Sequence, residues 1–298
     1  MASHSRSRRR SPRAGSGAFV APVLDPSWQS PYVPAHHERE HNLGAVRRVY
    51  WRRQTAWSSL VALIVIALVV AAVAASAWWG VGAAAVVVAY GIWTPAGVAR
   101  LRRRSADLGT RMAAGFVHGG DAHDHDRLNT VLERLTATFG VSGVHPVIVR
   151  DEAYNVALVR HQTGQSLLVT TALLEDFDLI ELEGAVAHCL ARERLGLVVR
   201  GCAAVVVGRD GDDRLSLAGP GTAYRADEVA AAQIRYPAGL AQALRRCGSQ
   251  EIPADSYFSS ADYDVTRCLW LNPRCGQAEP RDGDLDHPIV RARALEEW

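Results

Sequence analysis

The sequence predicts an α+β protein in which an N-terminal two-helix transmembrane hairpin precedes a mainly helical domain with a small antiparallel sheet. Three observations support this fold class. An uncharged run extends from Gln54 to Ala99. Three short segments between positions 146 and 170 are rich in β-branched residues, which is typical of strands. Much of the sequence after position 104 has apolar residues at helical spacing. We therefore divide the chain into residues 1–45, 46–104 and 105–298.

Residues 1–45 are rich in Arg, Ser, Pro and His and have no hydrophobic periodicity. Such a composition cannot bury a core, so we expect a disordered cytoplasmic tail. Its run Ser-Arg-Ser-Arg-Arg-Arg-Ser-Pro is of a kind that can bind nucleic acid or acidic lipid, but it also occurs in solvated tails. We favour the solvated tail and expect no nucleic-acid partner.

The uncharged run sets the prediction for residues 46–104. Its 46 residues contain no Asp, Glu, Lys, Arg or His. As one helix the run would be about 69 Å long, against roughly 30 Å of bilayer hydrocarbon, so it must fold back on itself. The sequence Trp78-Trp79-Gly80-Val81-Gly82 offers the turn, which predicts spans at about 56–77 and 81–99. A buried soluble hairpin is the alternative, whereas a cleaved signal peptide would start earlier and be shorter.

Arginines border both ends of this run and predict its orientation. Arg47, Arg48, Arg52 and Arg53 precede it, and a second group follows it, namely Arg100, Arg102, Arg103 and Arg104. The positive-inside rule places both groups on the cytoplasmic side of a cell membrane. We expect the lipid bilayer and its anionic headgroups to be partners. The five cysteines form no C-x-x-C pair, which fits a reducing compartment.

Within residues 105–298 the patterns predict a helix to about Thr138, interrupted by a cluster of His and Asp between His118 and Asp126. This cluster fits either a metal site or an exposed turn with a helix cap, and we favour the cap. Strands are expected at 146–150, 155–160 and 166–170. A capping box at Asp178–Glu181 begins the next helix, a loop is expected over 208–221, a helix over 223–246, and a short helix after His287-Pro288.

The helix after Asp178 contains the most informative motif, Glu183-Gly-Ala-Val-Ala-His188-Cys189-Leu-Ala-Arg192. In the zinc-peptidase motif H-E-x-x-H, two histidines one turn apart bind Zn²⁺ and the glutamate is the general base. Here His188 holds the first ligand position, but Cys189 holds the position of the base and Arg192 that of the second ligand. A guanidinium has no lone pair to donate and carries a positive charge.

Several blocks of the sequence, in the same order, resemble the HtpX-like membrane zinc metallopeptidases. They cover roughly 100–298 and comprise Pro146-Val-Ile-Val with Asn155, Val169–Leu174, Glu181–His188, Tyr224–Ala230 with Gly239–Leu244, and His287-Pro288 with Arg291. The resemblance implies a metallopeptidase-like fold. It also implies that the third ligand, a glutamate in the family, falls on Ala223, and that Asp227 is a supporting acid. Of the family's site, only His188 and Asp227 remain.

We therefore predict no catalytic residue, no metal ligand unless His188 is one, and no cofactor. We expect Arg192 to replace the charge of the ion by pairing with Asp227 or Glu228, and Asp227 or a backbone carbonyl to hold His188. The predicted function is that of a membrane-anchored pseudo-peptidase, a binding or regulatory protein for peptide or membrane-protein segments or for an active paralogue.

Two alternatives remain open at this point. One is a divergent, active zinc-dependent endopeptidase with non-standard ligands, in which zinc would be the cofactor. The other is a structural membrane protein.

Overall fold

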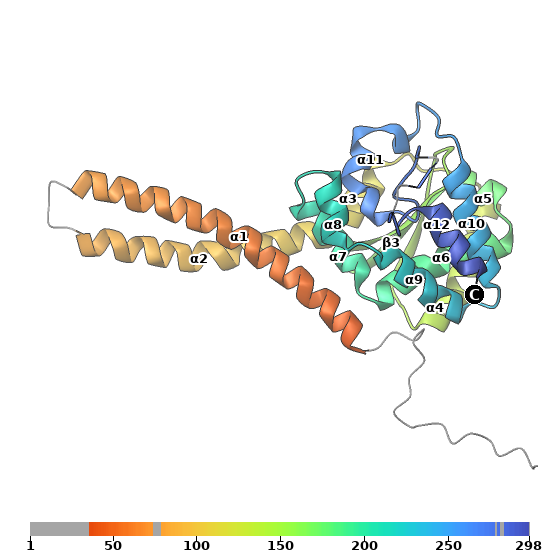
Figure 1. Cartoon of the computed structure of the whole chain (residues 1–298), viewed down its shortest axis with the longest axis horizontal. Helices are drawn as coiled ribbons and strands as arrows, with labels where there is room; N and C mark the ends of the chain where they lie inside the picture. Colours follow the sequence, from red (N-terminus) through yellow and green to blue (C-terminus); the bar gives the residue numbers. More distant parts are fainter. Residues whose placement is uncertain (1–35, 74–78, 278, 281–282, 298) are drawn as a thin grey trace, which may run out of the picture. The chain divides into compact units, whose positions relative to one another are not determined.

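The computed structural model describes residues 36–73, 79–277, 279–280 and 283–297 (Figure 1). These residues are mostly helical and contain one three-stranded sheet. The α-helices are α1 His36–Val73, α2 Trp79–Ala106, α3 Leu108–Gly115, α4 Ala122–Phe139, α5 Thr171–Asp176, α6 Leu179–Arg194, α7 Leu197–Val207, α8 Gly211–Ala218, α9 Thr222–Gln233, α10 Pro237–Ser249, α11 Ala261–Thr266 and α12 Pro288–Glu296. The strands are β1 Val144–Val149, β2 Val156–His161 and β3 Gly164–Thr170, and the 3-10 helices are η1 Tyr257–Ser259 and η2 Arg267–Leu269.

The strands lie where the sequence predicts them, but their pairing is different. The sheet order is β1-β3-β2, in which β3 pairs antiparallel with β2 and parallel with β1. The prediction of a purely antiparallel sheet is therefore wrong. The tight turn between His161 and Gly164 makes β2 and β3 a hairpin; Trp270 bridges to Ala157 of β2, and β1 pairs with the other edge of β3. Alternation of apolar residues predicts a strand, but it does not identify the neighbouring strand.

The core is centred on α6, which packs against α4, α9, α10 and β2. Helix α6 is buried on nearly every side, and the side chains from Ala185 to Ala191 are fully enclosed. Helix α10 approaches α6 closely at two glycines. A Cβ atom on Gly184 would lie 2.6 Å from the backbone of Leu240, and one on Gly239 would lie 2.5 Å from the carbonyl oxygen of Ile180.

Helices α1 and α2 lie side by side and both contact α7 (Figure 1). Polar side chains occupy the contact between them, since Ser58 and Thr94 are buried there and Gln54 donates to Ser58 over 3.2 Å. A Cβ atom on Gly97 would lie 2.1 Å from the Gln54 side chain, so the two helices approach closely at this point.

No helix in the described parts of the chain combines the length and the apolar composition that crossing a membrane requires. The prediction of a transmembrane hairpin is therefore wrong, and so is the cell-membrane localisation derived from it. Both helices extend beyond the uncharged run into arginine-rich sequence, α1 at its start and α2 at its end. Residue 78 of the predicted turn lies outside the described residues, and the rest of that turn belongs to α2.

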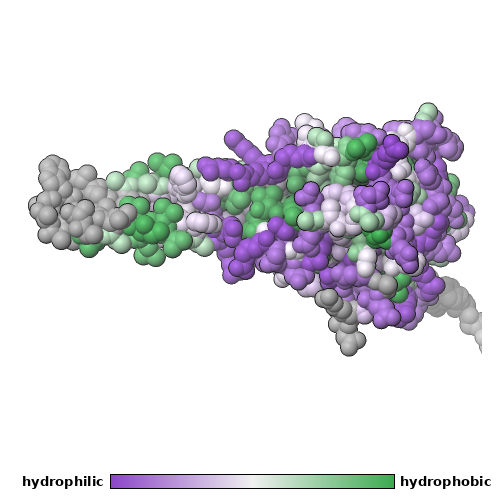
Figure 2. Space-filling view, turned by 90° about the horizontal axis from the view of Figure 1, so that it is seen from above, coloured by the Kyte–Doolittle hydropathy of each residue, from purple (hydrophilic) through white to green (hydrophobic). Residues whose placement is uncertain are grey.

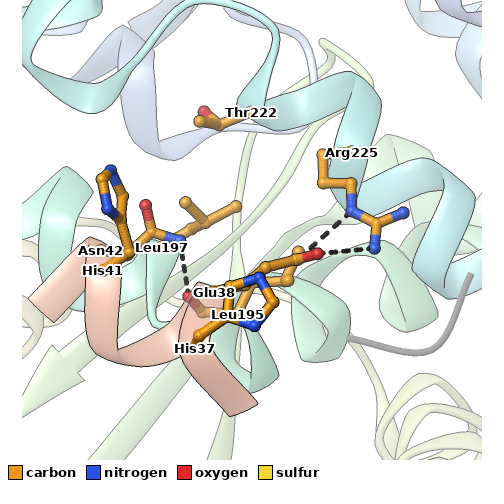
Figure 3. Close-up of a pocket in the computed structure, with 8 residues that line it drawn as sticks. All are labelled: His37, Glu38, His41, Asn42, Leu195, Leu197, Thr222 and Arg225. Carbon is orange, nitrogen blue, oxygen red and sulfur yellow. Dashed lines mark hydrogen bonds and ion pairs between the residues drawn. The ribbon is translucent and has the colours of Figure 1, made fainter. Parts of the chain in front are cut away.

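The first turns of α1 are fastened to the domain, although we predicted residues 36–45 as part of the disordered tail; residues 1–35 of that tail lie outside the described residues. Glu38 forms an ion pair of 3.0 Å with Arg225 of α9 (Figure 3). Asn42 donates to the carbonyl oxygen of Leu195 over 2.9 Å and accepts from Arg200 over 3.0 Å. Helix α7, helix α9 and the residue that follows α6 therefore all hold the beginning of α1.

Candidate functional site

His188 lies on α6, whose start is fixed by the predicted capping box. The Asp178 carboxylate accepts from the backbone N–H of Glu181 over 2.7 Å, and the Glu181 carboxylate accepts from the N–H of Asp178 over 2.9 Å. This cap satisfies backbone donors that an isolated helix end would leave unpaired. Two and a half turns further along, His188 is fully buried, with 0% of its surface exposed.

Asp227 reaches His188 from α9. The imidazole Nδ1 and the Asp227 Oδ1 are 2.6 Å apart, and both side chains are buried. The predicted support of His188 by Asp227 is therefore present. The other proposed carboxylate, Glu228, pairs instead with Arg225 of its own helix over 2.8 Å.

Arg291 of α12 completes the cluster. Its Nε donates to Asp227 Oδ2 over 2.6 Å and its Nη2 to Oδ1 over 2.8 Å, so the ion pair is bidentate. Its Nη1 donates to the carbonyl oxygen of Leu271 over 2.6 Å, and no part of the residue is exposed. We call His188, Asp227 and Arg291 the buried triad.

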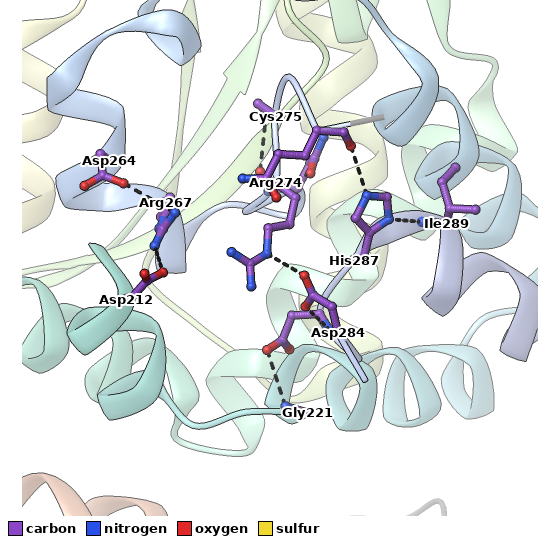
Figure 4. Close-up of polar contacts among 12 residues, drawn as sticks. Asp212, Gly221, Asp264, Arg267, Arg274, Cys275, Asp284, His287 and Ile289 are labelled. Carbon is purple, nitrogen blue, oxygen red and sulfur yellow. Dashed lines mark hydrogen bonds and ion pairs between the residues drawn. The ribbon is translucent and has the colours of Figure 1, made fainter. Parts of the chain in front are cut away.

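The motif His287-Pro288 explains how Arg291 reaches this place. The buried His287 caps α12 by accepting from the N–H of Ile289, and its Nε2 contacts the carbonyl oxygen of Gln277 (Figure 4). Pro288 occupies the first position of the helix, where its missing N–H is harmless. Arg291 follows one turn later. In the sequence His287-Pro288-Ile-Val-Arg291, a helix cap is therefore followed, one turn later, by a buried cation.

The charges within the triad follow from burial and pairing. Burial lowers the pKa of His188 to about 4, although Asp227 opposes this shift, so the imidazole is neutral at pH 7. Burial alone would raise the pKa of Asp227, but the charge and hydrogen bonds of Arg291 together with the contact with His188 outweigh burial, and the pKa is lowered. For Arg291, burial would lower the pKa of the guanidinium, but the charge and hydrogen bonds of Asp227 together with the charge of Asp286 outweigh burial and raise it. The cluster is thus a carboxylate–guanidinium ion pair with a neutral imidazole.

This state fixes the tautomer of His188. A neutral ring beside a carboxylate donates from Nδ1, which leaves the lone pair on Nε2. Nε2 is buried and has no hydrogen-bond partner among the described residues. His188 therefore retains the tautomer that a metal ligand needs, but its free nitrogen is enclosed in the protein.

Arg192 is also buried, but it does not meet either of the predicted acids. Its Nη2 donates to the carbonyl oxygen of Cys268 over 2.8 Å, and its Nη1 donates to that of Leu269. These carbonyls end the 3-10 helix η2, where backbone acceptors lack helical partners. The prediction that Arg192 pairs with Asp227 or Glu228 is wrong, because Arg291 already neutralises Asp227 and Arg225 neutralises Glu228.

Cys189, at the position of the general base, has the properties of a core residue. It is fully buried, and burial raises the pKa of its thiol to about 12, although Arg192 opposes the shift. The thiol is therefore protonated at neutral pH, and a nucleophile would need the thiolate. No hydrogen bond joins it to His188 among the described residues, as expected of neighbours on a helix whose side chains diverge.

Ala223, at the position of the third ligand, lies in the first turn of α9, one turn before Asp227. Its methyl group offers no donor atom. The backbone at this end of α9 is occupied by Asp286, whose carboxylate accepts from the N–H groups of Gly221 and Ala223.

The His118–Asp126 cluster forms a helix cap, as we favoured. The Asp121 carboxylate accepts from the N–H of Asp124 over 2.9 Å, and the Asp124 carboxylate accepts from the N–H of Asp121 over 3.1 Å, at the start of α4. The remaining side chains of the cluster are mostly exposed.

The residues present do not fit a zinc ion. Structural and catalytic zinc sites need at least three protein ligands. Within residues 36–73, 79–277, 279–280 and 283–297, no three His, Cys, Asp or Glu side chains come together in a way that could hold a metal. The positions that would supply two of the ligands hold a guanidinium and a methyl group.

Sequence reasoning missed the part of Arg291 in the site, although it singled out the residue. The available signal was the short spacing between the cap His287-Pro288 and Arg291, which directs the side chain into the core. A carboxylate is the strongest partner for a buried arginine, and Asp227 was the acid already assigned to the site.

No family model matches the chain, and the searches found neither a curated protein nor a solved structure that is similar to it. The resemblance to HtpX-like peptidases therefore remains a prediction from the motifs quoted above.

Proposed function

We propose that this protein is a pseudo-peptidase, a metallopeptidase-like domain that has lost zinc binding and proteolysis and acts by binding. The observation that carries the proposal is the buried triad. A hydrolytic metal centre keeps one coordination position open to water and substrate. Here the one histidine of the motif is enclosed and held by an ion pair of 2.6 Å, between Asp227 and Arg291.

The replacements at the neighbouring positions support the same proposal. Arg192, at the position of the second zinc ligand, donates to two backbone carbonyls, so its role is to support the fold. The Cys189 thiol is protonated and buried, so it cannot replace the missing base. We infer that the domain keeps its shape while its reactive groups serve packing, and that its partner is a polypeptide segment or an active paralogue.

The test is the zinc content of the full chain, measured by atomic absorption after incubation with excess zinc and desalting. We expect a stoichiometry near zero, and the same value for a His188→Asn control. Cleavage of fluorescein-labelled casein with and without a chelator is measured in parallel. A stoichiometry near one that His188→Asn abolishes, together with chelator-sensitive cleavage, would overturn the proposal in favour of a divergent zinc endopeptidase.

A further inference from the structure

Four arginines line a pocket where the hairpin helices meet the domain, away from the buried triad. The pocket has a volume of about 350 Å³. Its arginines come from three elements: Arg47 from α1, Arg102 and Arg103 from α2, and Arg160 from β2. This volume is within the range of small-molecule sites. Figure 2 shows hydrophilic side chains gathered where the hydrophobic part of the hairpin ends.

The charge of this pocket is only partly compensated within the described parts of the chain, by an attraction between Arg160 and Glu193, which lies outside the lining. No Asp or Glu is among its lining residues. The four arginines are exposed, and none of them forms an ion pair with a described carboxylate. Like charges that share a pocket repel one another, so an anion that enters between them relieves an unfavourable interaction.

Two neutral groups beside the arginines add hydrogen-bonding capacity. Tyr50 and Ser105 line the same pocket, are almost fully buried and hydrogen-bond to each other. Burial raises the pKa of Tyr50 to about 12, so its phenol remains protonated. With the Ser105 hydroxyl donating to the phenol oxygen, the phenol O–H of Tyr50 is left to donate to an oxyanion.

Helix electrostatics explains only part of this arrangement. Arginines in the last turn of a helix interact favourably with its dipole, which accounts for Arg103 at the end of α2. It does not account for Arg47, in the interior of α1, or for Arg160, near the end of a strand. Elements far apart in the sequence bring these cations together.

We propose that this pocket binds a phosphate-bearing anion. Guanidinium groups match phosphate oxygens in geometry and charge, and three or four of them can surround one phosphate or diphosphate group. The anion is either a free phosphate compound or the headgroup of a phospholipid. The proposal is independent of the proposed pseudo-peptidase function, because the pocket and the triad share no residue.

The experiment measures binding of two probes to the full chain. Pyrophosphate is titrated calorimetrically, and vesicles of phosphatidylcholine with and without phosphatidylglycerol are used in co-sedimentation. The pocket variant is R47Q/R102Q/R103Q. The matched control is R52Q/R53Q/R104Q, which removes the same charge from exposed arginines of the same two helices that do not line the pocket. Circular dichroism confirms that both variants are folded.

We expect the pocket variant to lose at least about tenfold in affinity and the control to lose much less, since charge-assisted bonds to phosphate are directional. Binding of pyrophosphate identifies a free phosphate compound. Binding only to the phosphatidylglycerol vesicles, with the same dependence on the pocket, identifies a headgroup. An equal loss of affinity in both variants would mean that binding depends on net positive charge and not on the pocket, and would overturn the proposal. Failure of the wild-type chain to bind either probe would overturn it as well.

Discussion

At the scale of single residues, Arg192 and Arg291, the two arginines that are buried in the described part of the chain, have their charges compensated in different ways. Arg291 has a carboxylate, Asp227, within 2.6 Å. Arg192 has only the carbonyl oxygens of Cys268 and Leu269. The carboxylate places a full negative charge beside Arg291, whereas Arg192 has only the dipoles of two carbonyl groups. Removing the Arg291 guanidinium therefore leaves a buried charge unpaired, whereas removing that of Arg192 leaves only unpaired carbonyl groups.

We expect Arg291→Met to lower the free energy of unfolding by about 3–5 kcal/mol, because Asp227 would be left buried without a counter-charge. Arg192→Met leaves two unpaired carbonyls but no unpaired charge, so its cost should be smaller, about 1–3 kcal/mol. Urea unfolding of both variants measures the difference. The double variant Arg291→Met/Asp227→Leu should recover part of the loss, and equal costs for the two single variants would contradict this account.

The buried imidazole of His188 predicts that stability depends on pH. Its pKa is lowered from 6.5 to about 4 in the folded state, so the unfolded chain binds more protons between these values. The contribution is fully present above pH 6.5 and is lost as the pH falls toward 4. At about 1.4 kcal/mol for each pH unit, the loss is roughly 3 kcal/mol. The lowered pKa of Asp227 acts in the same direction at lower pH.

Urea unfolding between pH 7 and pH 4.5 measures this dependence. We expect the free energy of unfolding to fall more steeply in the wild-type chain than in His188→Leu, which has no proton to take up at this position. Parallel pH profiles of the two proteins would show that His188 is not the group responsible.

Some of the site follows from the sequence and some does not. The contact of His188 with Asp227 could be predicted, because the motif blocks place both on neighbouring helices. The partner of Asp227 could be predicted only in part: the spacing after His287-Pro288 indicates that Arg291 is buried, but no local pattern specifies which carboxylate, 64 residues earlier, it meets. For the same reason Arg192 was assigned to the wrong partner.

At the scale of elements, the crossing of α6 and α10 depends on glycine. Gly184 allows the Leu240 backbone to approach to a distance that any Cβ atom would prevent. Gly91 in α2 is also helical, but it is exposed and a Cβ atom there would meet nothing within 4 Å. The two positions thus share secondary structure and differ in packing.

We expect Gly184→Ala to destabilise the domain by about 1–3 kcal/mol, because the added methyl group forces the two helices apart. Gly91→Ala should be neutral or stabilise by up to about 1 kcal/mol, since it only removes the flexibility of glycine from a helix. Thermal unfolding of both variants compares them. Similar melting temperatures would mean that α10 can shift without loss.

Periodicity and capping signals predicted most elements, including α6, α12 and the cap of α4, because these signals are local. Helix α8 was missed: its sequence lies between Gly208 and Gly221, and the flanking glycines indicated a loop over the whole segment. The predicted helix over 223–246 is divided into α9 and α10. The pairing of β1 with β3 was missed because register is decided by tertiary contacts.

At the scale of the whole molecule, the uncharged run correctly indicated two helices but not their boundaries. Charge is easy to read in a sequence, whereas a helix continues wherever backbone hydrogen bonds and packing allow. The start of α1 packs on the domain through Glu38 and Asn42, and these contacts join residues more than 150 positions apart. Composition alone assigned this segment to the tail.

We expect Asn42→Ala to loosen the start of α1, because it removes the hydrogen bonds to Leu195 and Arg200 at a cost of about 1–3 kcal/mol. Amide hydrogen exchange should quicken in the first turns of α1 and remain unchanged in α6. His41→Ala is the matched control, since this neighbouring exposed side chain forms no hydrogen bond with the described residues. Slower or unchanged exchange in α1 of Asn42→Ala would mean that the hydrogen bonds of Asn42 do not hold the start of α1 on the domain.

The position of Arg291 in the chain has a consequence for folding during synthesis. The ribosome makes His188 and Asp227 first, and Arg291 follows Asp227 after 64 residues. At roughly 5–20 residues per second this delay is roughly 3–13 s. Until it ends, the carboxylate has no counter-charge, and enclosing it in the core is unfavourable. The nascent domain should therefore remain open around α6 and α9 until α12 has left the ribosome.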